Sequence, residues 1–257
     1  MRGQSAVFLG RQPVVDRAGN VVAFELLFRS SPECGCACFS DDRLATAGVV
    51  TRAFRQVGIR AVVGDARALV NVCAETLMNR MIETLPPEQI VIELLEGVHI
   101  EDRLVRRCRT LKARGYRFAL DDFCHYREIY DPLLEIVDVV KIDILGLGPA
   151  PLAALVAKLR SWPALLLAEK VESPERAREC RELGFDLFQG FHFGRPVVLG
   201  RHPLGAGPER AQLAAARRAT LRFSRAGRSE RPMSRPQFPA DRRFHLLGAA
   251  AGRRLCA

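Results

Sequence analysis

The chain has 257 residues, of which 48% are hydrophobic, so it can bury a large core as one α/β barrel or as two small domains. It contains no run of roughly 18 uncharged apolar residues, and residues 1–5 lack the apolar core of a signal peptide, so we expect a cytoplasmic protein without a membrane span. The net charge of +10 comes from residues 201–257, which hold 13 arginines and three acidic residues, whereas residues 1–200 hold 26 basic and 26 acidic side chains.

Eight short apolar segments have the composition of β-strands. They are, in chain order, residues 7–15, 21–28, 69–73, 90–95, 117–123, 139–144, 165–171 and 187–193. Only residues 16–20 separate the first two, and so short a connection makes these two strands antiparallel. Segments with helical periodicity lie between most of the others, at residues 42–57, 75–84, 101–114, 128–136, 151–161 and 174–183.

This alternation of strands and helices indicates an α/β fold with a largely parallel sheet, and continuous apolar runs such as residues 90–92 indicate burial on both faces. We predict a modified (β/α)8 TIM-like barrel with an antiparallel first strand, formed by residues 5–199. An open, doubly wound sheet is disfavoured because the chain has no Gly-rich turn of the dinucleotide-binding kind and because polar residues end nearly every strand.

Polar side chains occur at or near the end of most predicted strands. They are Glu25, Asn71, Glu93, the pair Asp121 and Asp122, Lys141, Glu169 and Gln189, and Arg29 follows Glu25 closely. Because a barrel gathers the carboxyl ends of its parallel strands on one face, we expect these residues to converge there. The sequence therefore predicts a single site assembled from distant positions.

The acids of this set would repel one another in a partly dry site, and divalent cations would remove that conflict. Carboxylate oxygens and the amide of Asn71 suit Mg²⁺ or Mn²⁺ better than zinc, which prefers nitrogen and sulfur. Two such ions can activate a water and stabilise the leaving oxygen in a displacement at phosphorus. Lys141 would position or help to deprotonate that water, and Arg29 offers a planar fork for a phosphate oxygen, so the set indicates phosphodiester hydrolysis.

Seven segments together resemble the ordered motifs of the EAL domain family. They are Phe24-Glu25-Leu26-Leu27-Phe28-Arg29, Val70-Asn71-Val72, Ile92-Glu93-Leu94-Leu95-Glu96, Ala119-Leu120-Asp121-Asp122-Phe123, Val140-Lys141-Ile142-Asp143, Ala168-Glu169-Lys170-Val171-Glu172 and Phe188-Gln189-Gly190-Phe191. The resemblance covers residues 5–199. It implies a barrel with an antiparallel first strand that hydrolyses the bacterial second messenger cyclic di-GMP to pGpG with two Mg²⁺ or Mn²⁺ ions.

The resemblance also implies roles for individual residues. The ligands of one ion would be Glu25, Asn71, Glu93 and Asp121, and those of the other Asp121, Asp122 and Glu169. Lys141 would position the water, which makes Lys141, Glu25 and Glu169 the expected catalytic residues. The expected substrate-binding residues are Arg29, Gln12 and Gln189, and Glu96 would stabilise the loop that follows Asp122.

That loop departs from the family pattern, because Cys124-His125-Tyr126 replaces the usual Gly-Thr-Gly, and glycines allow backbone conformations that these residues resist. With Glu-Leu-Leu in place of Glu-Ala-Leu, the chain resembles the subgroup in which an EAL module precedes an HDOD signalling module. Hydrolysis is often weak or absent in that subgroup. The alternative interpretation is therefore an inactive module that senses cyclic di-GMP or binds signalling proteins, and the family resemblance suggests homodimers in either case.

Residues 200–257 are rich in Arg, Ala, Gly and Pro and are predicted to form a disordered tail. The tail has no lysine and no recognisable nucleic-acid-binding fold, so we expect no nucleic-acid partner. Our hypothesis is that the chain is a truncated or frameshifted product, in which the tail stands where an HDOD module would begin. Cys34, Cys36 and Cys38 could hold a soft metal, but a loop with incidental cysteines is the favoured interpretation because no other Cys or His cluster accompanies them.

Overall fold

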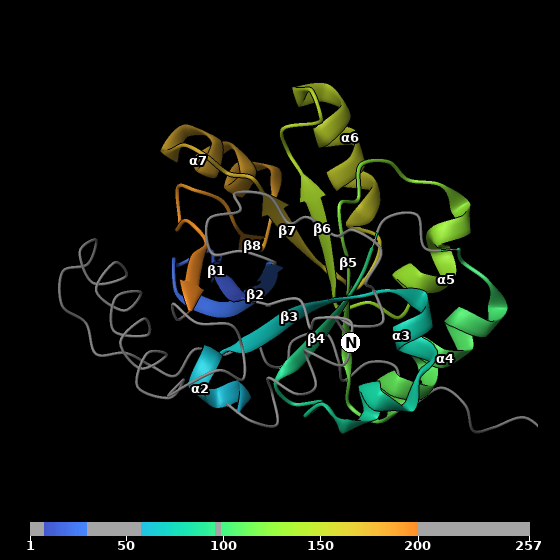
Figure 1. Ribbon diagram of the computed structural model, residues 1–257. Helices are drawn as coiled ribbons and strands as arrows, with labels where there is room; N and C mark the ends of the chain where they lie inside the picture. The colour runs from blue at the N-terminus through green and yellow to red at the C-terminus, as the bar shows by residue number, and fades with distance from the viewer. Residues whose placement is uncertain (1–7, 30–57, 96–98, 200–257) are drawn as a thin grey trace, which may run out of the picture.

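The computed structural model describes residues 8–29, 58–95 and 99–199 of the protein (Figure 1). The strands are β1 Phe8–Asp16, β2 Val21–Arg29, β3 Arg67–Val72, β4 Ile90–Leu94, β5 Arg117–Leu120, β6 Val139–Asp143, β7 Leu165–Glu169, β8 Leu187–Phe188 and β9 Val197–Leu199. Strands β2 to β8 pair with their neighbours in parallel, and β1 closes the sheet because it pairs antiparallel with both β2 and β8. The predicted barrel with an antiparallel first strand is thereby confirmed.

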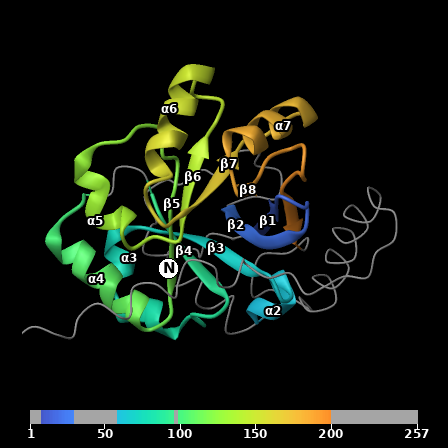
Figure 2. The same cartoon turned by 180° about the vertical axis from the view of Figure 1, so that it is seen from behind.

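The helices lie outside the strands, as the two opposite views in Figures 1 and 2 show. They are α2 Ile59–Val63, α3 Ala74–Met78, α4 Asp102–Ala113, α5 Asp131–Leu134, α6 Pro149–Leu159 and α7 Pro174–Leu183, with the 3-10 turns η1 Arg80–Thr84 and η2 Glu128–Tyr130. The longest of these has 12 residues, and within the described ranges none is long and apolar enough to cross a membrane.

Local sequence explains where the clearest helices begin, end and pack. In α7, the hydroxyl of Ser173 accepts a hydrogen bond from the Arg176 N–H at 3.2 Å, Pro174 occupies the first turn, and Gly184 ends the helix with φ 102°. In α4, the buried side chains are Leu104, Val105, Cys108 and Leu111, whose spacing gives one apolar face.

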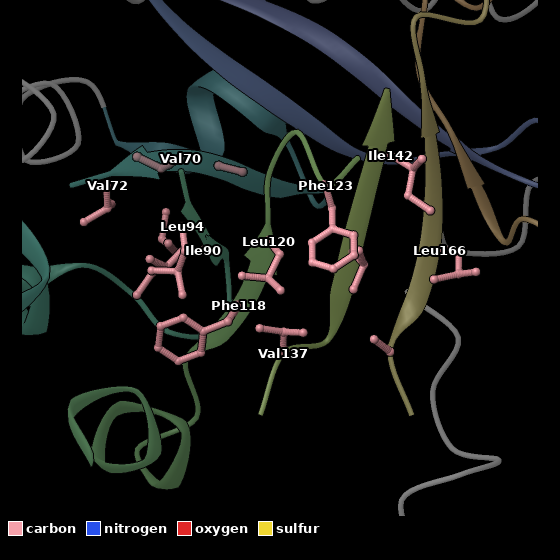
Figure 3. Packing of buried hydrophobic residues seen from close by; sticks show 14 of the residues in the cluster. Val70, Val72, Ile90, Leu94, Phe118, Leu120, Phe123, Val137, Ile142 and Leu166 are labelled. Atoms are coloured by element: carbon pink, nitrogen blue, oxygen red, sulfur yellow. The ribbon is translucent and has the colours of Figure 1, made fainter. Parts of the chain in front are cut away.

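The strands bury both faces, and alternate residues contribute to two separate clusters. The outward residues pack under the helices, and Figure 3 shows Ile90 and Leu94 of β4 beside Phe118 and Leu120 of β5 in this layer. The inward residues form a second cluster inside the barrel, made of Val14, Val22, Ala23, Leu69, Val91, Ala119, Val139, Leu167 and Leu187. The barrel is therefore filled by side chains, as expected for eight strands.

Some predicted elements differ in detail. Strand β8 has two residues where seven were expected, because the chain turns at Gly190, whose φ is 150°. The short helix α2 and strand β9, which adds to β1 at Leu9–Arg11, were not predicted from the sequence. The predicted helix at 42–57 and the cysteines at 34–38 lie outside the described residues, as does the tail from 200 onward.

Candidate functional site

A ring of polar side chains lies inside the barrel, one layer beyond the inner apolar cluster. On each of the parallel strands β2 to β8 the polar residue comes two positions after an inward apolar residue, as Glu93 follows Val91, whereas on the antiparallel β1 Gln12 comes two positions before Val14. Because side chains alternate between the faces of a strand, this spacing directs the polar groups inward as well. Gln12, Glu25, Asn71, Glu93, Asp121, Lys141, Glu169 and Gln189 make up this polar layer.

Lys141 lies among the carboxylates of the polar layer. Its Nζ is 2.6 Å from both Glu93 Oε1 and Asp121 Oδ1. It is also 3.1 Å from Glu169 Oε1 and 3.7 Å from Glu25 Oε1. Lys141 and Glu93 are fully buried, and the exposed fractions of the other three are 8–9%, so these charges interact with little screening by water.

The pKa values of the polar layer reflect this crowding. Burial tends to lower the pKa of Lys141, but its four carboxylate neighbours outweigh burial and raise it well above its ordinary value. Burial raises the pKa of Glu93 well above 4.5 and that of Glu169 to about 8, in both cases against the influence of Lys141. One buried ammonium therefore offsets the charge of these carboxylates only in part.

The acids fall into two groups, each of which could hold a cation. Glu25, Glu93 and Asp121 form one, and Asp121, Asp122 and Glu169 form the other, with the oxygens of each group within 4.8 Å of one another. Asp121 belongs to both. The exposed carboxyl of Asp122 joins the second group from a backbone with φ 49°, and its pKa is raised by partial burial and by Asp121.

The donor set fits hard divalent cations. The buried atoms Asn71 Oδ1, Glu93 Oε2 and Glu169 Oε2 have no hydrogen-bond partner within the described part of the chain. Asn71 lies directly beside Glu93 in the register of β3 and β4, so the two side chains are on the same face of the sheet. Unpartnered buried oxygens are costly unless a ligand satisfies them, and oxygen donors of this kind suit Mg²⁺ and Mn²⁺.

Two glutamines complete the polar layer beside Glu25. The Nε2 of Gln189 donates to Glu25 Oε2 at 2.6 Å and to Gln12 Oε1 at 3.3 Å. Gln12 lies opposite Glu25 in the antiparallel pairing of β1 and β2. The structure thus brings together all the predicted site residues that it describes in full. Arg29 ends β2 but its side chain lies outside the described residues, as does all of Glu96.

Sequence reasoning missed Lys170. This residue directly follows Glu169, has φ 57°, and donates a hydrogen bond to the carboxylate of Asp143. Its ammonium partly opposes the rise in the pKa of Asp122 that burial and Asp121 cause, so it adds positive charge beside the second acidic group. Its position next to a strand-end glutamate was the available signal.

The loop after Asp122 packs against α5 and α6. Tyr126 donates a hydrogen bond to Asp131 Oδ1 at 2.7 Å, and the ammonium of Lys158 lies 4.4 Å from the centre of its ring. Cys124 Sγ lies 3.1 Å from His125 Nδ1, and both residues are at least partly exposed. The non-glycine residues of this loop therefore make specific contacts that Gly-Thr-Gly could not make.

Comparisons with solved structures agree with the fold. A PaMucR phosphodiesterase in complex with c-di-GMP shares 21% identity, with a TM-score of 0.60 over 77% of this chain and 97% of that one. Klebsiella pneumoniae BlrP1 with manganese and cyclic di-GMP shares 23%, with a TM-score of 0.59 over 77% of this chain and 57% of that one. At these identities the likeness shows a common architecture.

Sequence comparisons are more specific. The chain is 33% identical over 202 residues to the uncharacterized protein YuxH of Bacillus subtilis, covering 77% of this chain and 49% of that protein. It is 31% identical over 194 residues to the cyclic di-GMP phosphodiesterase CdgJ of Vibrio cholerae, covering 75% and 45%. The chain thus spans about half the length of these relatives. The EAL domain model matches residues 5–196, and the chain belongs to the EAL domain family.

Proposed function

We propose that the protein is a metal-dependent phosphodiesterase that hydrolyses cyclic di-GMP to pGpG. The observation that carries this proposal is the pair of acidic groups that share Asp121 and surround Lys141 inside the barrel rim. Membership of the family supports it, as do the relative CdgJ, named as a cyclic di-GMP phosphodiesterase, and BlrP1, solved with manganese and this nucleotide. We infer a cytoplasmic location as well, because the substrate is an intracellular messenger.

In this proposal Mg²⁺ or Mn²⁺ occupies each acidic group. Glu25, Asn71, Glu93 and Asp121 would hold one ion, and Asp121, Asp122 and Glu169 the other. Two such ions supply activation of a water and stabilisation of the leaving oxygen in an in-line displacement at phosphorus. The unpartnered oxygens of Asn71, Glu93 and Glu169 support this assignment because a cation would satisfy them.

The remaining residues act on the water and the nucleotide. Lys141 keeps its proton under the field of four carboxylates, so it would act as a fixed positive charge and hydrogen-bond donor that orients the water. Arg29, at the end of β2, would bind a phosphate oxygen with its planar guanidinium. We further propose that Gln189 contacts the nucleotide and that Glu96 stabilises the loop after Asp122.

The test uses the full chain with cyclic di-GMP and Mn²⁺, and chromatography measures pGpG. Glu25→Ala removes a proposed ion ligand, so turnover should fall by at least about a hundredfold while the thermal unfolding midpoint stays within a few degrees. Glu88→Ala is the matched control, because Glu88 is exposed and precedes β4 at the opposite end of the barrel. Unchanged turnover in Glu25→Ala would refute the metal assignment.

The contacts of the loop after Asp122 favour a second candidate, a module that binds cyclic di-GMP without efficient hydrolysis. Tyr126 is bonded to Asp131 and packed under Lys158, which restrains a segment next to the second acidic group. Equilibrium binding of cyclic di-GMP with Ca²⁺ or Mn²⁺ separates the candidates. Binding without pGpG would favour the sensor, and neither binding nor pGpG would favour a scaffold for signalling proteins.

A further inference from the structure

The amides of Gln12 and Gln189 form a hydrogen-bonded chain that ends on the carboxylate of Glu25. Gln12 Nε2 donates to the backbone carbonyl of Gly194 at 3.1 Å, and Gln12 Oε1 accepts from Gln189 Nε2 at 3.3 Å. The same Nε2 donates to Glu25 Oε2 at 2.6 Å. These hydrogen bonds therefore link the segment before β9 to a carboxylate of the first acidic group through two side chains.

The chemistry at the two ends determines how both amides are oriented. A backbone carbonyl and a carboxylate can only accept hydrogen bonds, so each must face an NH₂ group. Gln12 therefore turns its nitrogen to Gly194, which leaves its oxygen facing Gln189. Gln189 then turns its nitrogen to both Gln12 and Glu25. Reversing either amide would set oxygen against oxygen at one end of the chain.

Backbone contacts hold the members of this chain in place. The N–H of Gln189 donates to Ala168 at 2.9 Å, and its carbonyl accepts from Val171 at 3.0 Å. A Cβ added to Gly194 would lie 2.7 Å from Pro13 Cγ, so the absence of a side chain lets this segment approach β1. The carbonyl of Gly194 reaches Gln12 because of that close approach.

We propose that Gln12 is a positioning residue that orients Gln189 and, through it, Glu25, before any nucleotide binds. The inference rests on the proposed function, in which Glu25 holds an ion. It differs from the substrate contact that the family resemblance implies for Gln12, because both ends of this amide are already engaged within the protein. Residues that orient the ligands of a metal act on ion affinity itself.

The deciding measurement is the affinity for Mn²⁺ by isothermal titration calorimetry in the full chain without nucleotide. Gln12→Met preserves the length of the side chain but removes both hydrogen bonds, and we expect it to weaken Mn²⁺ binding about tenfold. The matched control is Gln89→Met, because Gln89 is buried and donates to the Gly64 carbonyl at 3.3 Å, away from the polar layer. A Gln12→Met variant that binds Mn²⁺ like the wild type would overturn the proposal.

A double-mutant cycle tests whether Gln12 acts through Gln189. Combining Gln12→Met with Gln189→Met should weaken Mn²⁺ binding no more than Gln189→Met alone, because both changes break the same series of hydrogen bonds. Additive losses would show independent roles and overturn the inference. If thermal unfolding shows that Gln12→Met does not fold, Gly194→Ala is the second variant. Its added Cβ would push the Gly194 segment away from Pro13, which breaks the hydrogen bond to Gln12 without altering Gln12 itself. It should also weaken Mn²⁺ binding, and unchanged affinity would again overturn the proposal.

The outcomes for this inference and for the proposed function are distinguishable. A wild-type protein that binds Mn²⁺ but forms no pGpG, with weakened binding in Gln12→Met, would support the positioning role and refute the enzyme. A wild-type protein that forms pGpG, with equal Mn²⁺ affinity in Gln12→Met, would support the enzyme and refute the positioning role. Failure of the wild type to bind Mn²⁺ at all would overturn both.

Discussion

At the scale of single residues, Lys141 supplies the positive charge that partly compensates the carboxylates of the polar layer. It is the one cation among the eight members of that layer, and four carboxylates lie within 3.7 Å of its Nζ. Burial alone would favour the neutral amine, yet the carboxylates keep it protonated. In the absence of ions, the folded state therefore depends on this ammonium to offset buried negative charge.

Lys141→Met should consequently destabilise the metal-free protein. Removing one partner of a buried charge cluster leaves carboxylates uncompensated, and we expect a loss of about 3–5 kcal/mol in the free energy of unfolding by urea. Mn²⁺ should recover part of this loss because it supplies positive charge to the same acids. Lys170→Met serves as a control, since that half-exposed lysine forms a surface ion pair with Asp143 and should change stability by less than about 1 kcal/mol. Equal stability of Lys141→Met and wild type without Mn²⁺ would contradict the expectation.

At the scale of elements, Gly190 allows the end of β8 to reach the end of β7. Its φ of 150° is a conformation that other residues rarely adopt, and a Cβ there would collide with the backbone of Val171. Two backbone hydrogen bonds join the segments that follow these strands. The Val171 N–H donates to the Gln189 carbonyl at 3.0 Å, and the His192 N–H donates to the Val171 carbonyl at 3.1 Å. This approach brings Gln189 to Glu25.

Gly190→Ala should therefore lower the free energy of unfolding by more than about 2 kcal/mol, because the backbone at Val171, just after β7, has to move. Gly19→Ala separates the steric cost from the conformational cost, since Gly19 has φ 78° with open space around it and should lose only about 1 kcal/mol. Denaturant unfolding of the two variants provides the measurement. A smaller loss at 190 than at 19 would show that the close approach is unimportant.

Another contact between elements gives a pH dependence. Glu83 of η1 accepts hydrogen bonds from Arg107 and Arg114 of the α4 region, and these hold the pKa of Glu83 below its ordinary value of 4.5. A carboxyl whose pKa is lowered by folding stabilises the protein above that ordinary value and loses this contribution as the pH falls through the folded value.

Glu83→Gln should thus lower the thermal unfolding midpoint at pH 7 and make no difference at a pH well below 4. The comparison requires melting curves of the variant and the wild type across this interval. Glu88→Gln is the matched control, because it removes an exposed carboxyl from the same connection before β4. If the effect of Glu83→Gln were the same at both pH values, the two arginine contacts would not be its cause.

At the scale of the whole molecule, the described barrel ends with β9, which pairs with β1 at Leu9–Arg11 and buries Leu199. The family model ends at residue 196, close to the same point. We propose on this basis that the chain divides into a barrel domain at residues 5–199 and a separate basic segment at 200–257. The positive charge of that segment would then be independent of the polar layer.

A chain shortened after Leu199 should accordingly unfold in one cooperative transition at the midpoint of the full chain, and it should bind Mn²⁺ with the same affinity. Differential scanning calorimetry and calorimetric titration provide the two measurements. A shift of more than about 4 °C would correspond to more than roughly 1–2 kcal/mol of lost contacts and would contradict this division. A second variant that ends at residue 196 removes β9 and should be destabilised, because Leu199 is then missing from the core.

The sequence by itself predicted the order of the strands, the polar residues at or near their ends and the antiparallel first strand. A strand alternates its faces with a period of two, so Glu93 shares a face with Val91 and Lys141 shares one with Val139. The turn at 16–20 likewise predicts the antiparallel first strand from local chain length alone. These features depend on neighbours in the sequence. The structure confirms the antiparallel first strand, whereas the chemical roles of the polar residues stay predictions.

Only the tertiary structure decided how those residues meet. Gln189 and Glu25 are 164 positions apart, and their contact depends on barrel closure, on the register of β1 against β2, and on the turn at Gly190. The central place of Lys141 and the orientation of Gln12 follow from the same closure. Helix α2 and strand β9 were missed because packing of distant segments stabilises such short elements more than local propensity does.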